Sequence, residues 1–541
     1  MNAYDYFLTL TRLWIIIHSL FYESLDRLED LIKRPIDNTF SLKKLSTDFS
    51  FAIHPIMDPD QYIQLSGPLF EAVQKAGLFS DSKTFVDATP KIPPAMILRS
   101  YEKEKDNPSF HLKNFIIRSF EVPSNLPLSS PSLKVNTMEE YIEATWKVLL
   151  KDMKASSPYS TLISLPHPHI VPGGRFRECF YWDSYFTALG LSSPKHLPLI
   201  KMMVENFAYL IDLLGFIPNG NRIYFTTRSQ PPYFSFLLST LFELGEEAFA
   251  LQYFDQLEKE YHYWMNHSLR LGENLYLNHY FDTANLPRPE AYKREIELSK
   301  TSKNPQLFQH LRAACASGWD FSSRWIADPK RWETIEALNI LPIDLNCLLF
   351  HLEETLARFS KQLDKNPKEY LFSAQRRKQA IQTLFWKDDF FFDYHYLKKT
   401  HTPIYSLAAC TPLFVKACTQ KQADLVAKKL KKSFLLKGGF VTSLTESAHQ
   451  WDMPNGWAPL QWITVQGLLH YGHRTLAIEG AKRWLKLNEK IFLQEGTLLE
   501  KYNVRDCSID VTRGEYALQQ GFGWTNGVAL KLMELLNGFK T

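Results

Sequence analysis

The sequence lacks the patterns that mark several large classes of enzyme and binding protein. Its six cysteines lie far apart, without a Cys-x-x-Cys pair or a Cys/His spacing typical of metal sites. It has no Gly-x-Ser-x-Gly segment and no glycine-rich phosphate loop. We therefore expect neither a metal nor a cofactor, and we interpret the cysteines as reduced thiols of a cytoplasmic protein.

Long runs of one charge are also absent. Lys and Arg number 62 and Asp and Glu 58, so the formal net charge is only +4 over 541 residues. The densest basic run, at 428–432, is interleaved with apolar residues, as on the solvent-facing side of an amphipathic helix. This balance argues against nucleic acid as a partner.

No apolar run has the length that a membrane span needs. The most apolar stretch, 7–22, contains Arg12 and His18 and is shorter than the ~20 residues of a span. No small-residue cleavage site follows it, so we expect neither secretion nor a membrane partner. We interpret residues 1–60 as an N-terminal helical appendage of unknown role.

Alternation typical of strands is scarce, and helical periodicity dominates from 138 to the C-terminus. The predicted helical segments are 138–154, 197–215, 234–266, 342–365, 368–386, 420–435, 458–472, 474–495 and 524–538. Only 222–225 and 390–396 suggest short hairpin strands. Because 61–541 contains no clear linker, we predict one large all-α domain and a monomer. Periodicity leaves open whether its helices form a closed ring or a solenoid.

The segment 172–186 combines features that neither a core nor an ordinary loop needs together. It reads Pro-Gly-Gly-Arg-Phe-Arg-Glu-Cys-Phe-Tyr-Trp-Asp-Ser-Tyr-Phe. Sugars have flat faces that stack on aromatic rings and hydroxyls that pair with charged, forked side chains. Trp182 or Phe176 beside Arg175 and Asp183 supplies both, which favours a sugar site. The alternative is a loop whose ion pairs and rings only hold the domain together.

Later segments repeat this combination of acid or arginine with aromatic, glycine or proline. They are 218–222, 228–232, 288–290, 317–320, 450–457, 500–502, 514–516 and 521–524. Long loops on a helical scaffold are where function is usually found. Acids and aromatics without a metal or nucleophile motif are typical of glycoside hydrolysis, which needs two carboxyl groups flanking the bond.

Six acids are candidates for those two carboxyl groups. They are Glu178, Asp183, Asp320, Asp452, Glu500 and Glu515. Asp320 follows Trp319, and an indole that excludes water favours a protonated carboxyl, as a general acid requires. Glu500 precedes Lys501 and Tyr502, a polar setting that favours a charged carboxylate. Sequence neighbours need not touch, so this reasoning ranks the candidates without choosing between them.

Two segments, 172–185 and Gln-Trp-Asp-Met-Pro-Asn-Gly-Trp-Ala-Pro at 450–459, resemble the diagnostic segments of the trehalase family of glycoside hydrolases. The resemblance extends over about 62–538 and includes Gly-Phe-Gly-Trp-Thr-Asn-Gly at 521–527. It implies an (α/α)6 barrel with its long loops at one end. It also implies hydrolysis of α,α-trehalose to two glucose molecules, with inversion and no cofactor.

Residue by residue, the resemblance makes Asp320 the general acid and Glu500 the general base. Inversion then predicts a separation of ~6.5–9.5 Å between the two carboxyl groups, which leaves room for water. The same matching assigns substrate contacts to Arg175, Phe176, Trp182, Asp183, Asn219, Arg228, Ser229, Gln230, Arg288, Pro289, Glu290, Gly318 and Glu515. We add Trp451 as a stacking platform.

The sequence departs from the family pattern between the base and the last acid. The family has a glycine-rich loop there, whereas 503–513 contains no glycine. Fewer glycines put closure of this loop over the sugar in doubt. Two other functions remain open: a hydrolase or phosphorylase for another α-glucoside on the same barrel, and a sugar-binding protein without catalysis.

Overall fold

The computed structural model describes residues 61–79, 81–123, 135–273, 275–512, 514 and 516–539. All of them belong to one compact unit, Pro59–Thr541. The predicted appendage at 1–60 and its apolar stretch lie outside the described residues.

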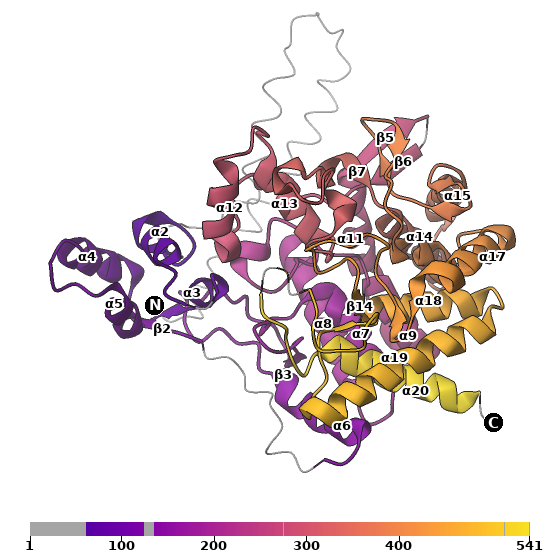
Figure 1. Cartoon of the computed structure of the whole chain (residues 1–541), viewed down its shortest axis with the longest axis horizontal. Coiled ribbons are helices and arrows are strands. Elements are labelled where there is room, and N and C mark those ends of the chain that lie inside the picture. The colour runs from indigo at the N-terminus through magenta and orange to yellow at the C-terminus, as the bar shows by residue number, and fades with distance from the viewer. Residues whose placement is uncertain are drawn as a thin grey trace, which may run out of the picture. The chain divides into compact units, whose positions relative to one another are not determined.

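Six of the described helices form a closed ring. In chain order they are α7 (Tyr181–Leu189), α9 (Phe234–Glu243), α14 (Ile343–Gln362), α16 (Thr411–Phe414), α18 (Ala458–His470) and α20 (Gly523–Gly538). Each of them packs against the next, and α20 packs back against α7. The labelled ring helices α7, α9, α18 and α20 lie close together in Figure 1. The ring is therefore closed, a point that periodicity had left open.

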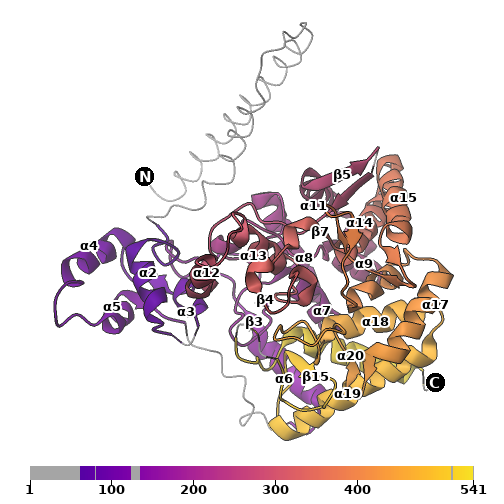
Figure 2. The same cartoon turned by 45° about the horizontal axis from the view of Figure 1, so that its top comes forward.

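A second set of helices covers the outside of this ring. These are α6 (Met138–Leu149), α8 (Leu197–Leu214), α11 (Phe254–Asn266), α15 (Lys368–Thr383), α17 (Gln420–Lys429) and α19 (Arg474–Glu495). For example, α8 packs on α9, α15 on α14, and α19 on α18 and α20. Figure 2 shows α6, α15, α17 and α19 along the outer side. The two layers form an (α/α)6 barrel, which confirms the fold class expected from the resemblance.

Burial separates the two layers. All nine residues of α7 are buried, whereas α19 buries one face and exposes lysines and glutamates on the other. A helix that is apolar or enclosed on every side belongs in a core and shows no 3.6-residue periodicity. Periodicity therefore predicted no helix at 172–186, whereas its last six residues, from Tyr181, begin α7.

Each predicted helical segment contains at least one helix, but two details differ. Segment 234–266 is broken after Leu244 at Gly245, whose φ of +83° ends α9, so that α10 (Glu247–Leu251) and α11 follow. The predicted strand at 222–225 is wrong, because Ile223–Phe225 forms a 3-10 turn. Buried Tyr224 donates a hydrogen bond to Asp87 Oδ1 at 2.8 Å, a tertiary contact that overrides its strand propensity.

The remaining strands are short, and seven small sheets hold them in the described part of the chain. The predicted strand segment 390–396 contains β9 (Phe390–Phe391) and β10 (Tyr394–His395). The pair that matters for the site is β14 (Asn455–Trp457) with β15 (Lys501–Asn503), which run antiparallel with Trp457 opposite Lys501. This pairing brings the segment that follows Trp451 beside the segment that carries Glu500.

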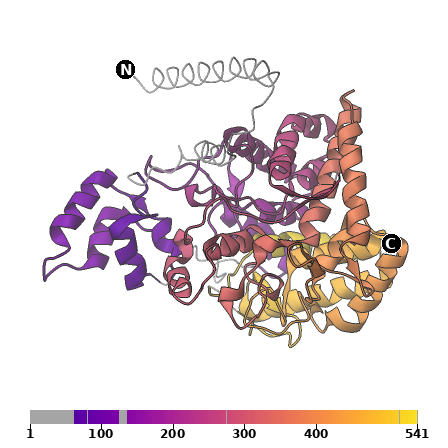
Figure 3. The ribbon, with the colours of Figure 1, turned by 90° about the horizontal axis from the view of Figure 1, so that it is seen from above.

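A group of helices before the barrel was not predicted from the sequence. It consists of α2 (Gly67–Ala76), α3 (Lys83–Val86), α4 (Pro94–Glu104) and α5 (Leu112–Ser119). These helices share a core that includes Phe70, Phe85, Ile97 and Phe115. Figure 3 shows this indigo group from above as one bundle. It bears on the site because α3 and the residues before it reach the cavity described below.

The contact between α7 and α20 is close enough to require glycine. A Cβ on Gly527 would lie 2.2 Å from the carbonyl oxygen of Phe186, and one on Gly190 would lie 2.7 Å from Gly527 Cα. Backbone atoms cannot move aside as a flexible side chain can. The ring therefore closes through two glycines that face each other.

We predict that Gly527→Ala lowers the free energy of unfolding by about 1–3 kcal/mol or more, because it overpacks this contact. Gly538→Ala in the same helix is the control, since a Cβ there meets nothing within 4 Å. Urea unfolding followed by circular dichroism measures both variants. Equal stability of Gly527→Ala and the parent would show that the two helices can separate without cost.

Candidate active site

The loops at one end of the ring enclose a cavity of about 410 Å³. Cavities of roughly 300–1,000 Å³ accommodate small ligands. Segments from very different parts of the chain line it, from Asp81 near α3 to Trp524 in α20. Its wall mixes arginines and acids with aromatic rings, which is the composition predicted for a sugar site.

Most of the predicted site residues meet in this cavity. Those that line it are Arg175, Phe176, Trp182, Asp183, Asn219, Arg228, Gln230, Arg288, Glu290, Gly318, Asp320, Trp451 and Glu500. Ser229 and Pro289 do not: the Ser229 hydroxyl donates to the Ile217 carbonyl at 2.7 Å, and the Pro289 carbonyl accepts from Gln74 Nε2 at 3.1 Å. Glu515 lies outside the described residues.

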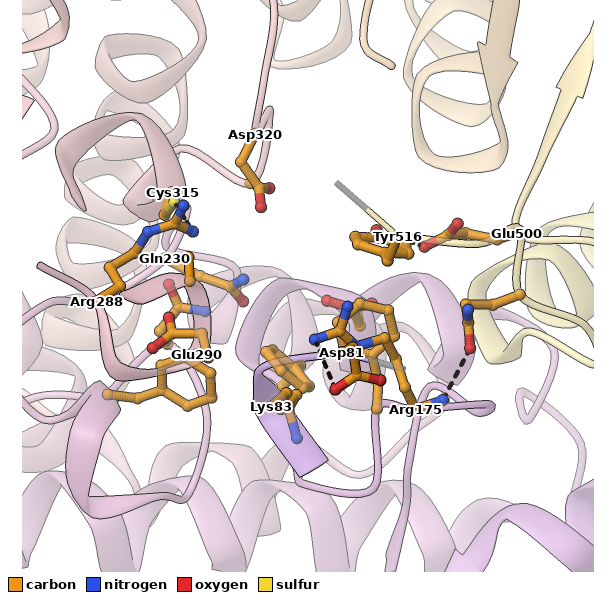
Figure 4. Close-up of a pocket in the computed structure, with 18 of the residues that line it drawn as sticks. Asp81, Lys83, Arg175, Gln230, Arg288, Glu290, Cys315, Asp320, Glu500 and Tyr516 are labelled. Carbon is orange, nitrogen blue, oxygen red and sulfur yellow. Dashed lines mark hydrogen bonds and ion pairs between the residues drawn. The ribbon is translucent and has the colours of Figure 1, made fainter. Parts of the chain in front are cut away.

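The two carboxyl groups of interest approach the cavity from different sides. Asp320 follows α13 (Leu307–Ala316), and Glu500 directly precedes β15. Figure 4 shows the Asp320 carboxylate and the Glu500 carboxylate directed into the same space. Gly318 makes the turn before Asp320 possible, because its φ is +74° and a Cβ there would lie 2.6 Å from the Trp182 ring.

Glu500 is almost completely buried, with 1% of its surface exposed. Its carboxylate oxygens and its main-chain carbonyl all accept hydrogen bonds. The Tyr516 hydroxyl donates to Glu500 Oε1 at 2.8 Å, and Lys501 Nζ donates to Oε2 at 3.3 Å. Trp524 Nε1 donates to the main-chain carbonyl of Glu500 at 3.0 Å. These contacts fix the orientation of the Glu500 carboxyl group at the cavity wall.

Asp183 is the third carboxyl group of the cavity. It lies on the fully buried helix α7, and burial raises its pKa well above the usual range. The neighbouring charges of Glu500 and Asp320 raise the same pKa further, although a backbone hydrogen bond opposes them. Three carboxyl groups in one small cavity therefore cannot all carry charge without strong compensation.

The three predicted arginines of the cavity, Arg175, Arg228 and Arg288, are each paired with an acid. Arg228 donates to Asn219 Oδ1 at 3.1 Å, to Asp282 Oδ2 at 3.2 Å and to Glu290 Oε1 at 3.2 Å. The forked guanidinium thus spans several acceptors with fixed geometry, which orients it toward the cavity.

The acids that balance the other arginines were not predicted from the sequence. Arg288 pairs with buried Glu295 and donates to Cys315 Sγ at 2.9 Å, and Arg175 lies 3.7 Å from Asp81. Glu295 stands on α12 (Tyr292–Ser299), seven residues beyond its partner. A spacing of seven residues between an arginine and an acid does not by itself predict an ion pair. Arg288 and Glu295 meet only because the chain turns between them.

Two of the six candidate acids support the site from outside it. Glu178 pairs with Lys83 and accepts from Arg222 Nε at 3.0 Å, which ties α3 to the segment before α7. Asp452 accepts from Ser322 Oγ and from the Ser323 amide, both at 2.9 Å. Asp452 thereby holds the residues that follow Asp320.

The indole rings form one connected cluster on the cavity wall. Trp451 stacks on Trp457 with ring centroids 3.8 Å apart and an interplanar angle of 1°. Trp182 contacts Trp451 at 5.7 Å, and Trp524 meets Trp182 edge to face at 5.7 Å. Such packing makes the aromatic surface rigid before any sugar arrives. Among the described residues, no group of three His, Cys, Asp or Glu side chains could hold a metal ion.

Curated relatives match nearly the whole chain. A periplasmic trehalase of Xanthomonas oryzae pv. oryzae is 41% identical over 502 residues, covering 90% of this chain and 88% of the relative. A periplasmic trehalase of Citrobacter koseri is 39% identical over 501 residues, covering 89% and 88%.

These relatives correct the expected compartment. The interpretation of a cytoplasmic protein was wrong, since the relatives are named periplasmic. It relied on unpaired cysteines, but Cys179, Cys315, Cys347, Cys410 and Cys418 are buried, and buried thiols are inert in either compartment. In the part of the chain that the structure covers, no helix is long and apolar enough to cross a membrane.

Solved structures show the same likeness. The neutral trehalase Nth1 from Saccharomyces cerevisiae superposes with a TM-score of 0.57 at 29% identity, over 68% of this chain and 73% of that one. An uncharacterized conserved protein from Thermus thermophilus superposes with a TM-score of 0.50 at 15% identity, over 74% of this chain and 100% of that one. The second likeness concerns the fold alone.

The family model named Trehalase matches residues 77–537, which include the barrel and nearly every residue that lines the cavity. The model, the relatives and the geometry of the cavity agree. The chain belongs to the trehalase family of glycoside hydrolases.

Proposed function

We propose that this protein hydrolyses α,α-trehalose to two molecules of glucose in the periplasm. The observation that carries the proposal is that Asp320 and Glu500 both line one cavity, whose remaining wall is made of arginines and indole rings. Family membership and the named activity of the relatives support trehalose as the substrate. The chemistry is a single displacement that inverts the attacked carbon.

In this mechanism Asp320 is the general acid and Glu500 the general base. Asp320 protonates the oxygen that bridges the two glucose rings, while Glu500 takes a proton from the attacking water. The water attacks from the face opposite the bridging oxygen, which requires ~6.5–9.5 Å between the carboxyl groups. The donors from Tyr516 and Lys501 to Glu500 support its role, because they hold its carboxyl group in a fixed orientation at the cavity wall.

The arginines and the aromatic cluster hold the sugar. Arg228 and Arg288 line the cavity with guanidinium groups whose orientation Glu290 and Glu295 fix. Guanidinium groups held in this way can donate hydrogen bonds to sugar hydroxyls. Trp182 and Phe176 offer apolar surface to the sugar ring. Asp183, Asn219, Gln230 and the unpredicted Asp81 complete the polar wall. Such preorganised contacts discriminate strongly against sugars that leave a buried polar group unpaired.

We predict that Asp320→Asn and Glu500→Gln each lower kcat on trehalose by about 10²–10⁴-fold, because each removes one proton transfer. Glucose release measured with a coupled assay gives the rates. Asp364→Asn and Glu489→Gln are matched controls at exposed positions and should retain full activity. If either active-site variant cleaved as fast as the parent, that residue would not be the acid or the base.

The stereochemistry of the products provides a second test. Inversion converts the attacked glucose to the β anomer, while the departing glucose keeps its α configuration. Proton NMR of freshly formed products should therefore show α and β glucose in equal amounts before mutarotation. Two α anomers would indicate a retaining mechanism and would rule out Glu500 as the base for a single displacement.

A further inference from the structure

Lys501 is a buried cation beside the proposed base, and the proposed mechanism uses it only as one of two donors to Glu500. Lys501 is the first residue of β15, and none of its side-chain surface is exposed. Its Nζ donates to Glu500 Oε2 at 3.3 Å and to Gln450 Oε1 at 2.6 Å. Lys501 does not line the cavity, so it cannot act by touching the substrate.

Burying a lysine is costly, which indicates that its position is used. Burial lowers the pKa of Lys501, and the charges of Glu500 and Asp320 raise it again. The ammonium lies 5.0 Å from the ring centroid of Trp457 and 5.1 Å from that of Tyr516, so two aromatic faces also stabilise the charge. An ion pair inside such a low-dielectric wall is far stronger than one on the surface.

The surroundings of Glu500 show why a cation is needed there. Among the described residues, Lys501 and Tyr516 donate to Glu500, and the negative charge of Glu500 acts on Asp183. The charge of Asp320 acts on the same Asp183, Lys501 and Tyr516. Asp183 is thus a second acid beside Glu500, and the Tyr516 hydroxyl donates a hydrogen bond without a full charge. Lys501 is the cation of this set.

Gln450 connects Lys501 to the segment that carries Asp320. Its Oε1 accepts from Lys501, and its Nε2 donates to the main-chain carbonyl of Asp320. The chain of contacts Glu500–Lys501–Gln450–Asp320 therefore joins the segment of the base to the segment of the acid. The two segments are 180 residues apart, and a shift of Lys501 would displace both.

We propose that Lys501 is the positioning residue that keeps Glu500 ionised and, through Gln450, sets the base segment against the acid segment. Glu500 then enters each turnover as a carboxylate, despite the two other carboxyl groups in the cavity. This inference rests on the assignment of Glu500 as the base. It adds a residue behind the catalytic pair whose effect is electrostatic and is separate from substrate binding.

The test is the pH profile of Lys501→Met. Without the cation the charged form of Glu500 is less stable, so the base becomes protonated at a higher pH and activity is lost earlier as the pH falls. The acid limb of the kcat/KM profile should move up by about one pH unit or more. At the optimum, kcat should fall about 100-fold while KM changes by less than about threefold.

Lys501→Arg keeps the charge and should leave the acid limb within about 0.3 pH unit of the parent. Lys490→Met is the matched control: this exposed lysine on α19 donates to the Cys507 carbonyl at 2.8 Å, and its loss should change neither rate nor profile. Circular dichroism and Tm are recorded for every variant. An unmoved acid limb in folded Lys501→Met, or an equal shift in Lys501→Arg, would overturn the inference.

Gln450→Leu separates the two parts of the proposal. It removes the link to Asp320 but leaves the ion pair, so kcat should fall while the acid limb stays in place. If the acid limb of the pH profile moved in Gln450→Leu, the shift would come from lost contact between the two segments and not from the charge of Lys501. Where Lys501→Met does not fold, Lys501→Gln removes the same charge and replaces it in this test. The parent is assayed in parallel: a parent that releases no glucose refutes the proposed function, whereas an active parent with unmoved variants refutes only the role of Lys501.

Discussion

Closure of the helical ring between α7 and α20 is the constraint on which the rest of the protein depends. Gly527 and Gly190 let the two helices approach until backbone meets backbone. The Gly523 amide donates to the Pro172 carbonyl at 2.8 Å, so the first residue of α20 is tied to the segment that leads into α7. Trp182 and Asp183 on α7 are thereby brought beside Trp524 on α20. Without closure, the cavity would lose one side.

A second constraint is that the charges in the cavity have to be compensated. The cavity holds several acids and arginines away from water, where an unpaired charge costs several kcal/mol. The structure meets this cost by pairing Arg175, Arg228 and Arg288 with acids, as with Arg288 and Glu295. The same logic applies to Glu500 and Lys501 on the opposite wall.

Rigidity around the catalytic residues comes from groups that never meet the substrate. Asp452 collects hydrogen bonds from the serines that follow Asp320, and Arg324 pairs with Asp344 and Asp393 between Trp319 and Trp325. A buried acid with several donors is well satisfied and resists displacement. These contacts hold the loop of Asp320 to the barrel. The indole next to Asp320 in sequence, Trp319, belongs to this support.

The amino-acid sequence by itself determined the helical class, the approximate helices and, through the family motifs, most of the residues that line the cavity. Helical periodicity predicts outer helices such as α8 correctly because one face of each is exposed to solvent. It failed for α7 because every side of that helix is buried. Only the tertiary structure decided that the ring closes, that Glu178 and Asp452 lie outside the cavity, that Glu295 lies against Arg288, and that Gln450 links Lys501 to the segment of Asp320. These are contacts between segments whose spacing in the chain carries no regular signal, and they exist only once the helices have packed.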